Sequence, residues 1–276
     1  MIKRTVAESR RDLPEVCGWL AWRSVVIGES VKRMPGTSIV RRSLMEIVEV
    51  ALLPGLGRPA TDFLPIVGPL QAAGFRCHLV EPPDTFPGEP TLLDLADDVA
   101  VRLQAAGPRY HLVGHAFGNR LARALVSRHG ESVASLTLLG AGGYIAMAQE
   151  VLESLTACYR PDVSEDGLRQ LVRRCMVAPG SDVGPYLTGW MAAVSTYQHD
   201  ALNRTPDESW VHASCAHTLV VQGLQDVIAV PENGRAYVRD NPTAKLVEID
   251  GAGHALVCEQ PNAVSTALVE FFRSAS

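Results

Sequence analysis

Apolar and polar positions follow two different periods from residue 45 onward. Short runs rich in valine, leucine and isoleucine are typical of buried strands, whereas longer stretches with apolar residues three and four positions apart are typical of helices. Strands are predicted at residues 46–53, 75–80, 109–113, 133–139, 218–221 and 245–249. Helices are predicted at residues 61–73, 92–106, 117–128 and 262–273.

This alternation of strands and helices predicts the α/β class, with a mainly parallel central sheet flanked by helices. In such sheets, ligands bind beyond the carboxyl ends of the strands. The alternation stops between residues 144 and 213, where the pattern is helical and shows no obvious strand. We therefore predict one domain over residues 45–276, with residues 144–213 forming a helical lid inserted after the fourth strand.

Residues 1–44 form an N-terminal extension that differs from the rest of the chain. They carry nine Lys and Arg against four Asp and Glu and show no regular period. One interpretation is a first hairpin, with strands at 24–27 and 38–42. The other is an unstructured leader ahead of Met45, which we favour because a compact version of the predicted fold can begin at the next strand.

Composition narrows the class of protein. The chain has 276 residues, 47% of them hydrophobic, and a net charge of −5, which fits one large domain and argues against a nucleic-acid partner. No apolar run is long enough to cross a bilayer and no convincing signal peptide is present, so we expect a cytoplasmic protein without a membrane partner. Six scattered cysteines without paired or metal-like spacing indicate reduced thiols. The oligomeric state stays open.

The candidate chemistry begins where the third predicted strand ends. Gly114, His115, Ala116, Phe117 and Gly118 follow it directly, and a predicted helix leaves them. A central residue with glycines two positions away on each side is typical of the nucleophile elbow, G-x-S-x-G. The spacing alone is equally compatible with an ordinary glycine-containing turn. If it is an elbow, Ala116 occupies the position of the nucleophile.

A second glycine loop follows the first strand, at Gly55, Leu56 and Gly57. Such a turn lets the backbone amide of Leu56 point at a substrate oxygen, and the amide of Phe117 would be a second donor. Two fixed donors of this kind form an oxyanion hole. The loop does not continue into a dinucleotide-binding fingerprint, and no metal-like cluster is present, so we expect no cofactor and no metal.

Two later strands are each followed by a candidate catalytic side chain. Asp226 lies in the loop after the fifth strand, and His254 lies in a glycine-containing loop after the sixth. A carboxylate beside a histidine fixes its tautomer and stabilises its protonated form. The order along the chain, elbow, then acid, then histidine, is the order used by enzymes with a nucleophile elbow of this kind.

Together these motifs resemble the α/β-hydrolase superfamily over about residues 45–274. The resemblance implies a mainly parallel sheet, a helical lid and a catalytic triad, which would consist here of position 116, Asp226 and His254. Ala116 departs from the pattern, since alanine offers no nucleophile and the acyl-enzyme route is closed.

The remaining candidates concern the substrate, which we expect to be a small molecule of small to medium size, largely apolar and carrying a carbonyl group. We expect Gly55, His115, Tyr144, Trp190 and Met191 to contribute to its binding site. For His115 the role is support of the elbow, not that of a base. Many of the aromatic and methionine side chains in the lid segment could equally pack the lid onto the core.

Three interpretations of Ala116 stay open. The alanine can be an engineered replacement of serine in an ester, thioester or lactone hydrolase. It can be natural in an enzyme that uses an Asp–His dyad as a base, as in a lyase, a cyclase or cofactor-free chemistry. Lastly, the protein can bind a ligand without catalysing a reaction.

Overall fold

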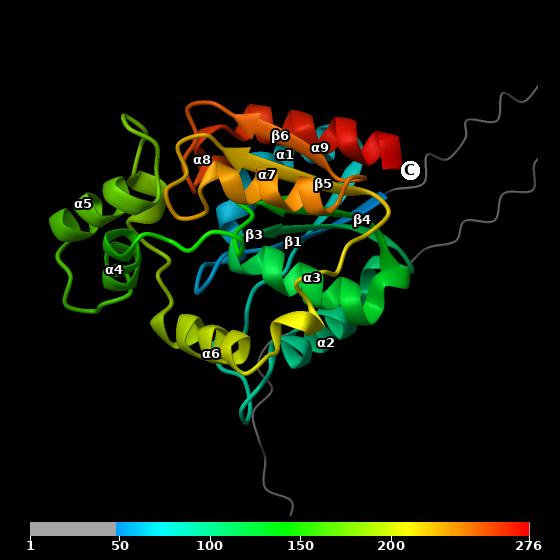
Figure 1. Ribbon diagram of the computed structural model, residues 1–276, viewed down its shortest axis with the longest axis horizontal. Helices are drawn as coiled ribbons and strands as arrows, with labels where there is room; N and C mark the ends of the chain where they lie inside the picture. Colours follow the sequence, from blue (N-terminus) through cyan, green and yellow to red (C-terminus); the bar gives the residue numbers. More distant parts are fainter. Residues whose placement is uncertain (1–47, 276) are drawn as a thin grey trace, which may run out of the picture. The chain divides into compact units, whose positions relative to one another are not determined.

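The computed structural model describes residues 48–275, so the N-terminal extension and the two interpretations of it lie outside the described residues. Six strands form one sheet in the order β2-β1-β3-β4-β5-β6, and every neighbouring pair is parallel (Figure 1). The strands are β1 Val48–Leu53, β2 Phe75–Leu79, β3 Tyr110–His115, β4 Val133–Leu139, β5 Thr218–Gly223 and β6 Lys245–Ile249. The predicted α/β class and its parallel sheet are therefore confirmed.

The burial of each strand follows from its place in the sheet. All residues of β3 and β5 are buried, whereas the edge strands β2 and β6 are partly exposed. Central parallel strands are covered on both faces, which is why they appear in the sequence as nearly continuous apolar runs. These runs made the strand positions predictable to within about two residues of the observed bounds.

Helices cover both faces of the sheet. The longer helices outside the insertion are α1 Leu64–Ala72, α2 Leu92–Leu103, α3 Phe117–His129, α7 Pro231–Asp240 and α9 Pro261–Ala275. Figure 1 shows α1 and α9 on one face and α2 and α3 on the other. One apolar core lies on the side of α2, α3 and α7, and a second lies on the side of α1 and α9. The short helix α8, Leu256–Glu259, leads into α9.

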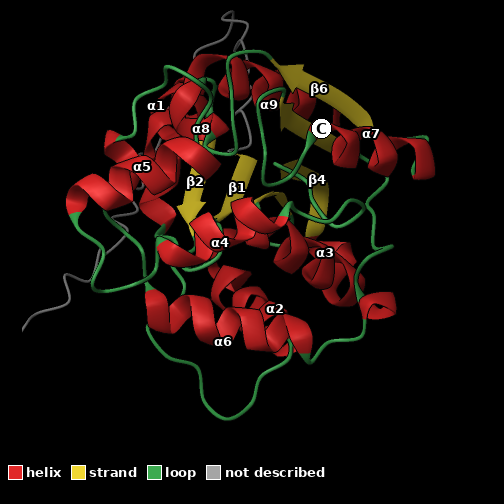
Figure 2. Ribbon diagram, turned by 60° about the vertical axis from the view of Figure 1, so that its left-hand side comes forward, coloured by secondary structure: helices red, strands yellow, loops and turns green. Residues whose placement is uncertain are grey.

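Between β4 and β5 the chain forms α4 Gln149–Ala157, α5 Glu165–Cys175 and α6 Ala192–Asn203. We refer to residues 144–213, the segment that contains them, as the insertion. Helices α4 and α5 pack on each other with a small apolar core of their own, and α6 lies beside α2 (Figures 1 and 2). The expected helical character is present, while the function of the insertion as a lid stays a prediction.

The strand order places one crevice in the sheet. From β1 the chain moves outward to β2 and then returns to the other side of β1 to form β3. The loops after β1 and β3 therefore leave the sheet side by side and in opposite directions. Such a reversal is where open α/β sheets bind their ligands. These two loops are the two glycine-containing segments identified in the sequence.

No helix within residues 48–275 is both long enough and apolar enough to cross a membrane. The same part of the chain contains no group of three or more His, Cys, Asp or Glu side chains placed to hold a metal ion.

Candidate active site

The turn between β3 and α3 has the backbone of a strained elbow. Ala116 has φ 52° and ψ −110°, and it is the one residue other than glycine with positive φ in the described chain. A Cβ atom on Gly118 would lie 2.1 Å from the carbonyl oxygen of Leu53, and one on Gly114 would lie 2.2 Å from the carbonyl oxygen of Gly118. Strand and helix approach so closely here that both positions require glycine.

The loops after β5 and β6 bring Asp226 and His254 together. The Nδ1 atom of His254 lies 2.8 Å from Oδ2 of Asp226, and both side chains are almost completely buried. Because a carboxylate oxygen accepts hydrogen bonds, Nδ1 carries the proton and donates it. In neutral His254 the other ring nitrogen, Nε2, therefore keeps its lone pair and can act as a base.

Asp226 is held in place by three further donors. Its Oδ1 atom accepts hydrogen bonds from the backbone amides of Ile228 at 2.9 Å and Ala229 at 2.8 Å. Its Oδ2 atom also accepts one from Nε2 of Gln222 at 3.2 Å. Four donors in all fix the carboxylate, so its orientation toward His254 is set by the loop that carries it.

His115 supports the loop that carries His254. Its Nε2 atom donates a hydrogen bond to the backbone carbonyl of His254 at 2.8 Å, and the two rings lie 4.9 Å apart. Burial, with smaller effects from the neighbouring His254 and Arg58, lowers the pKa of His115 to about 3. A histidine with this pKa stays neutral near pH 7 and is a poor base. This geometry agrees with the supporting role expected for His115.

The loop after β1 brings Leu56 beside the elbow. An added Cβ on Gly55 would lie 3.6 Å from the Cβ of Ala116, so the two backbones are neighbours. The amide of Gly57 donates to Oε1 of Gln198 at 2.8 Å, and the hydroxyl of Tyr159 donates to the carbonyl of Leu56 at 2.5 Å. The insertion therefore fixes this loop from outside.

A cavity of about 550 Å³ lies beyond these loops. Its wall includes most of the residues predicted from the sequence, namely Gly55, Leu56, His115, Ala116, Phe117, Tyr144, Trp190 and His254. Asp226 does not reach the wall and stays buried below His254. The expected contribution of Met191 needs correction, because it does not line the cavity. Its backbone amide instead donates to the carbonyl of Gly57 at 2.9 Å, which links the insertion to the loop after β1.

Several wall residues were not predicted from the sequence. The polar ones are Arg58, Arg120 and His199. Arg58 follows the glycine loop and Arg120 lies in the first turn after the elbow, so proximity to a motif was the one signal that could have found them. Nothing in the sequence marks His199, whereas Tyr159 is one of the lid aromatics for which the sequence left the cavity and the core as alternatives. Both reach the cavity through the folding of the insertion.

The chemistry available in the cavity follows from its wall. Among the described residues that line it there is no Ser, Thr, Cys, Asp or Glu. His254 and Ala116 both line the cavity, and Phe117 is the first residue of α3, whose amide has no partner within the helix. The wall thus offers a base and an amide suited to a developing negative charge, while its described residues supply no aliphatic hydroxyl, thiol or carboxylate that could act as a nucleophile.

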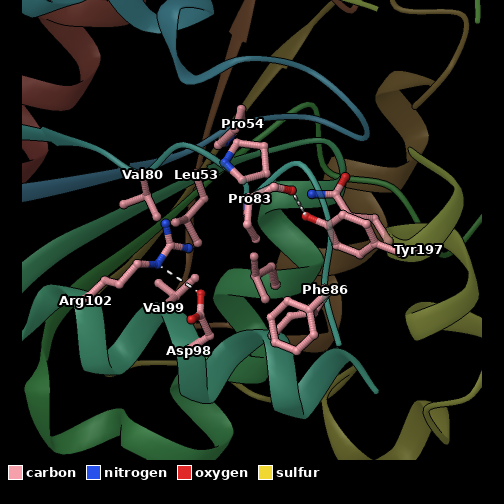
Figure 3. Close-up of a pocket in the computed structure, with 13 residues that line it drawn as sticks. Leu53, Pro54, Val80, Pro83, Phe86, Asp98, Val99, Arg102 and Tyr197 are labelled. Atoms are coloured by element: carbon pink, nitrogen blue, oxygen red, sulfur yellow. Dashed lines mark hydrogen bonds and ion pairs between the residues drawn. The ribbon is translucent and has the colours of Figure 1, made fainter. Parts of the chain in front are cut away.

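A second, much smaller cavity of about 20 Å³ lies between the loop after β2 and helix α2 (Figure 3). The figure shows the ion pair of Arg102 with Asp98 and the hydrogen bond from Tyr197 to the carbonyl of Pro83 at its edge. A space of this size holds about one water molecule, so it is too small for a substrate.

The sequence model that describes the alpha/beta hydrolase family matches residues 50–267, more than half of the chain. The chain belongs to this family. A search of curated protein sequences returned no significant match. Among solved structures, this family member is similar to hydrolases and esterases at a level of identity that establishes the fold alone.

Three of these structures illustrate the similarity. A thermophilic esterase from Thermogutta terrifontis is 21% identical with a TM-score of 0.67, covering 83% of this chain and 90% of that one. A hydrolase from Pseudomonas aeruginosa is 20% identical with a TM-score of 0.67, covering 83% and 91%. A carboxylesterase from Bacillus subtilis is 17% identical with a TM-score of 0.65, covering 83% and 85%.

Proposed function

We propose that this alpha/beta hydrolase acts on a carbonyl substrate by general-base catalysis, with His254 activating a water molecule to cleave an ester, thioester or lactone. One observation carries the proposal. The pair of His254 and Asp226 is complete, buried and next to the cavity, although Ala116 supplies no nucleophile for it to activate. A protein that only bound a ligand would have no use for a histidine held in one tautomer by a fixed carboxylate.

The proposed reaction has two steps. In the first, the water oxygen attacks the carbonyl carbon while His254 Nε2 takes the proton, and the negative charge moves to the carbonyl oxygen. The amides of Leu56 and Phe117 stabilise that oxygen, and a donor of this type contributes on the order of 10²- to 10³-fold to the rate. In the second, the carbonyl re-forms, the leaving alkoxide or thiolate takes the proton from His254, and a carboxylic acid is released.

Ala116 fits this reaction better than it fits a covalent one. Compared with serine, alanine lacks the hydroxyl oxygen at the point of the elbow. Ala116 and His254 line the same cavity, which supports a water molecule bound between them. A water molecule there would occupy the position from which the serine of a complete triad attacks.

A second candidate uses the same groups for a different step. His254 would remove a proton from the carbon next to the carbonyl, and the two amides would stabilise the resulting enolate, as in a lyase or cyclase. The largely apolar part of the wall, with Leu56, Phe117 and Ile228, favours this candidate because an apolar surrounding protects a reactive enolate from bulk water.

The test is a comparison of the protein with His254→Asn and Asp226→Asn on p-nitrophenyl esters, acyl thioesters and lactones of short and medium chain length. We expect measurable hydrolysis by the unaltered protein and a loss of roughly 10²- to 10⁴-fold in kcat in each variant. Deuterium exchange into the carbon next to the carbonyl, without hydrolysis and dependent on His254, would select the second candidate. Saturable binding without either reaction would mean that the protein is a binder.

A further inference from the structure

One arginine in the wall of the cavity that contains Ala116 and His254 has no hydrogen-bond or ion-pair partner among the residues that the structure describes. Arg120 lies in the first turn of α3, four residues after Ala116, and is half-buried. Its guanidinium group forms no hydrogen bond or ion pair with any residue from 48 to 275. A guanidinium group can donate five hydrogen bonds, so a partly buried one without partners leaves much of its bonding capacity unused.

The other two arginines of this region are held by the protein. Arg58 forms an ion pair with Asp62, donates to the carbonyl of Thr188 and lies over aromatic rings of the insertion. Arg123, one turn after Arg120, donates to the side chain of Asn119 and to two backbone carbonyls and lies over the ring of Trp210. Arg120 differs from both in being available for a ligand.

The position of Arg120 is also unfavourable without a ligand. Burial lowers the pKa of its guanidinium group. The carboxylate that counteracts this effect is Asp207, which is exposed and too far away for an ion pair. The first turn of a helix is the positive end of the helix dipole, where a cation is disfavoured and an anion is favoured. A charge placed at a cost to stability beside a cavity is typical of a functional group.

The rest of the wall is compatible with an anion. No carboxylate lines the cavity within the described residues, so nothing there would repel a negative group. Side chains of helical residues lean toward the start of their helix, so that of Arg120 leans toward the elbow. Four helical residues rise by ~6 Å, which places the base of Arg120 about one turn from Ala116.

We propose that Arg120 is a substrate-binding residue for an anionic oxygen group, either a carboxylate or a phosphate monoester, on a substrate whose remaining part is apolar. The identity of the reacting carbonyl rests on the proposed function, but the anion site does not. Arg120 binds the anion about one helical turn from Ala116. Apolar wall residues such as Met147, Leu152 and Leu155 contact the hydrocarbon part.

Binding is measured by calorimetry in the His254→Asn background, so that turnover does not interfere. The ligands are straight-chain carboxylates of four to ten carbons, alkyl phosphates of the same lengths and the matching primary amides. We expect at least one anion to bind tenfold or more tightly than its amide, and the comparison of carboxylates with phosphates identifies the preferred group. Equal binding of anions and amides, or no binding by any anion of either series, overturns the proposal.

Matched variants assign the preference to Arg120. Arg120→Met and Arg120→Gln should each abolish the preference for the anion, whereas Arg120→Lys should keep part of it. Arg173→Met is the control, because Arg173 is exposed on α5, forms no ion pair with any other described residue and does not line the cavity. A preference that survives in either neutral variant overturns the proposal.

The same experiments separate this proposal from the proposed function. Absence of any reaction, together with anion binding that depends on Arg120, refutes catalysis by His254 and leaves the anion site standing. Hydrolysis that depends on His254, with no preference for anions, does the opposite.

Discussion

At the scale of single residues, Ala116 has a positive φ angle, although its methyl side chain makes no use of that conformation. A residue in this sparsely populated region costs on the order of 1–3 kcal/mol and persists where the surroundings impose it. Here the surroundings are the backbones of β3 and α3, which approach each other closely because Gly114 and Gly118 have no side chains. The backbone geometry of a nucleophile elbow therefore forms although residue 116 is alanine.

The first prediction follows from that geometry. Ala116→Ser adds a hydroxyl beside His254 without changing the backbone, so the variant should have a complete triad. We expect its hydrolysis of p-nitrophenyl esters to exceed that of the unaltered protein by several orders of magnitude, because loss of such a serine costs on the order of 10⁶-fold in a complete triad. Initial rates measure the gain, and labelling by a fluorophosphonate confirms the nucleophile.

A serine at position 116 that is neither labelled nor active would contradict the arrangement of His254 and the two amides described above. The double variant Ala116→Ser, His254→Asn is the control, because it keeps the hydroxyl and lacks the base. It should be as inactive as His254→Asn alone.

The second prediction concerns His111, a buried histidine of β3 that donates to or accepts from Ser135 and stacks on Phe272. Burial, helped by nearby Arg109 and His217, lowers its pKa to about 4 from the usual 6.5. Below pH 6.5 this histidine is therefore protonated in the unfolded chain, whereas in the folded chain it stays neutral down to about pH 4. The contribution of this histidine to the free energy of unfolding is therefore complete above pH 6.5. It is lost as the pH falls from 6.5 toward 4, by at most about 1.4 kcal/mol per pH unit.

Urea unfolding at pH 7, 6 and 5 measures this effect. In His111→Gln the free energy of unfolding should fall less steeply toward pH 5, by about 1.4 kcal/mol per pH unit, because one proton fewer is taken up on unfolding. This comparison of slopes does not depend on how much stability the variant loses at pH 7. Because His115 has a lowered pKa as well, the decline should become shallower without disappearing. Parallel curves for the two proteins would show that His111 is protonated as readily in the folded chain as in the unfolded one.

The residues of the site differ in how far the sequence could predict them. The pair of Asp226 and His254 was predictable because the order and the glycine context of the motifs carry the information. Arg120 and His199 were not, since whether a side chain lines a cavity depends on contacts between distant segments. Met191 was misplaced for the same reason, as its backbone and not its side chain connects it to the site.

At the scale of elements, the elbow depends on the close approach of β1, β3 and α3. An added methyl group on Gly118 would overlap the carbonyl oxygens of Leu53 and Pro54. We expect Gly118→Ala to lower the unfolding free energy by roughly 3 kcal/mol, at the upper end of the range for overpacking, because both opposing atoms are backbone and cannot rotate away. Chemical denaturation measures the loss.

The matched control is Gly130→Ala, at the end of α3, where the backbone is helical with φ −59° and an added methyl group meets one atom, Cγ1 of Val126, at an ordinary contact distance of 3.9 Å. Alanine is the better helix former, so this variant should gain up to about 1 kcal/mol. Similar effects at the two glycines would mean that the close contact at the elbow is not a constraint on stability.

Helices and strands could be predicted where burial sets the pattern of apolar residues. They could not be predicted where contacts with distant segments determine the local structure. The sequence gives little indication of α7, Pro231–Asp240, because Asn233 and Gly234 lie inside it and both disfavour helix. The helix forms because the rest of the fold holds it. Asn233 accepts hydrogen bonds from the amides of Tyr144 and Ile145, and Gly234 allows close packing on the strands. The four-residue helix α8 is too short to show a period.

At the scale of the whole molecule, the insertion does more than line the cavity. It also holds the loop after β1 through three contacts: Gln198 with the amide of Gly57, Tyr159 with the carbonyl of Leu56, and Met191 with the carbonyl of Gly57. An added side chain on Gly57 would collide with the insertion at Ser195. One of the two proposed oxyanion donors is therefore positioned by a segment more than 100 residues away in the sequence.

The last prediction tests that coupling without requiring a substrate. Tyr159→Phe removes the hydrogen bond to Leu56, and a single hydrogen bond is worth about 0.5–1.5 kcal/mol, so the amides of residues 55–58 should exchange with deuterium roughly 3- to 10-fold faster. Tyr237→Phe is the control, since the buried hydroxyl of Tyr237 has no hydrogen-bond partner within residues 48–275 and its removal should leave the loop unchanged. Unchanged exchange in Tyr159→Phe would mean that β1 and the elbow alone order the loop. Faster exchange confined to that loop, with the sheet unaffected, would show that the insertion orders the amide of Leu56, so that changes in the insertion can alter the oxyanion site without touching the elbow.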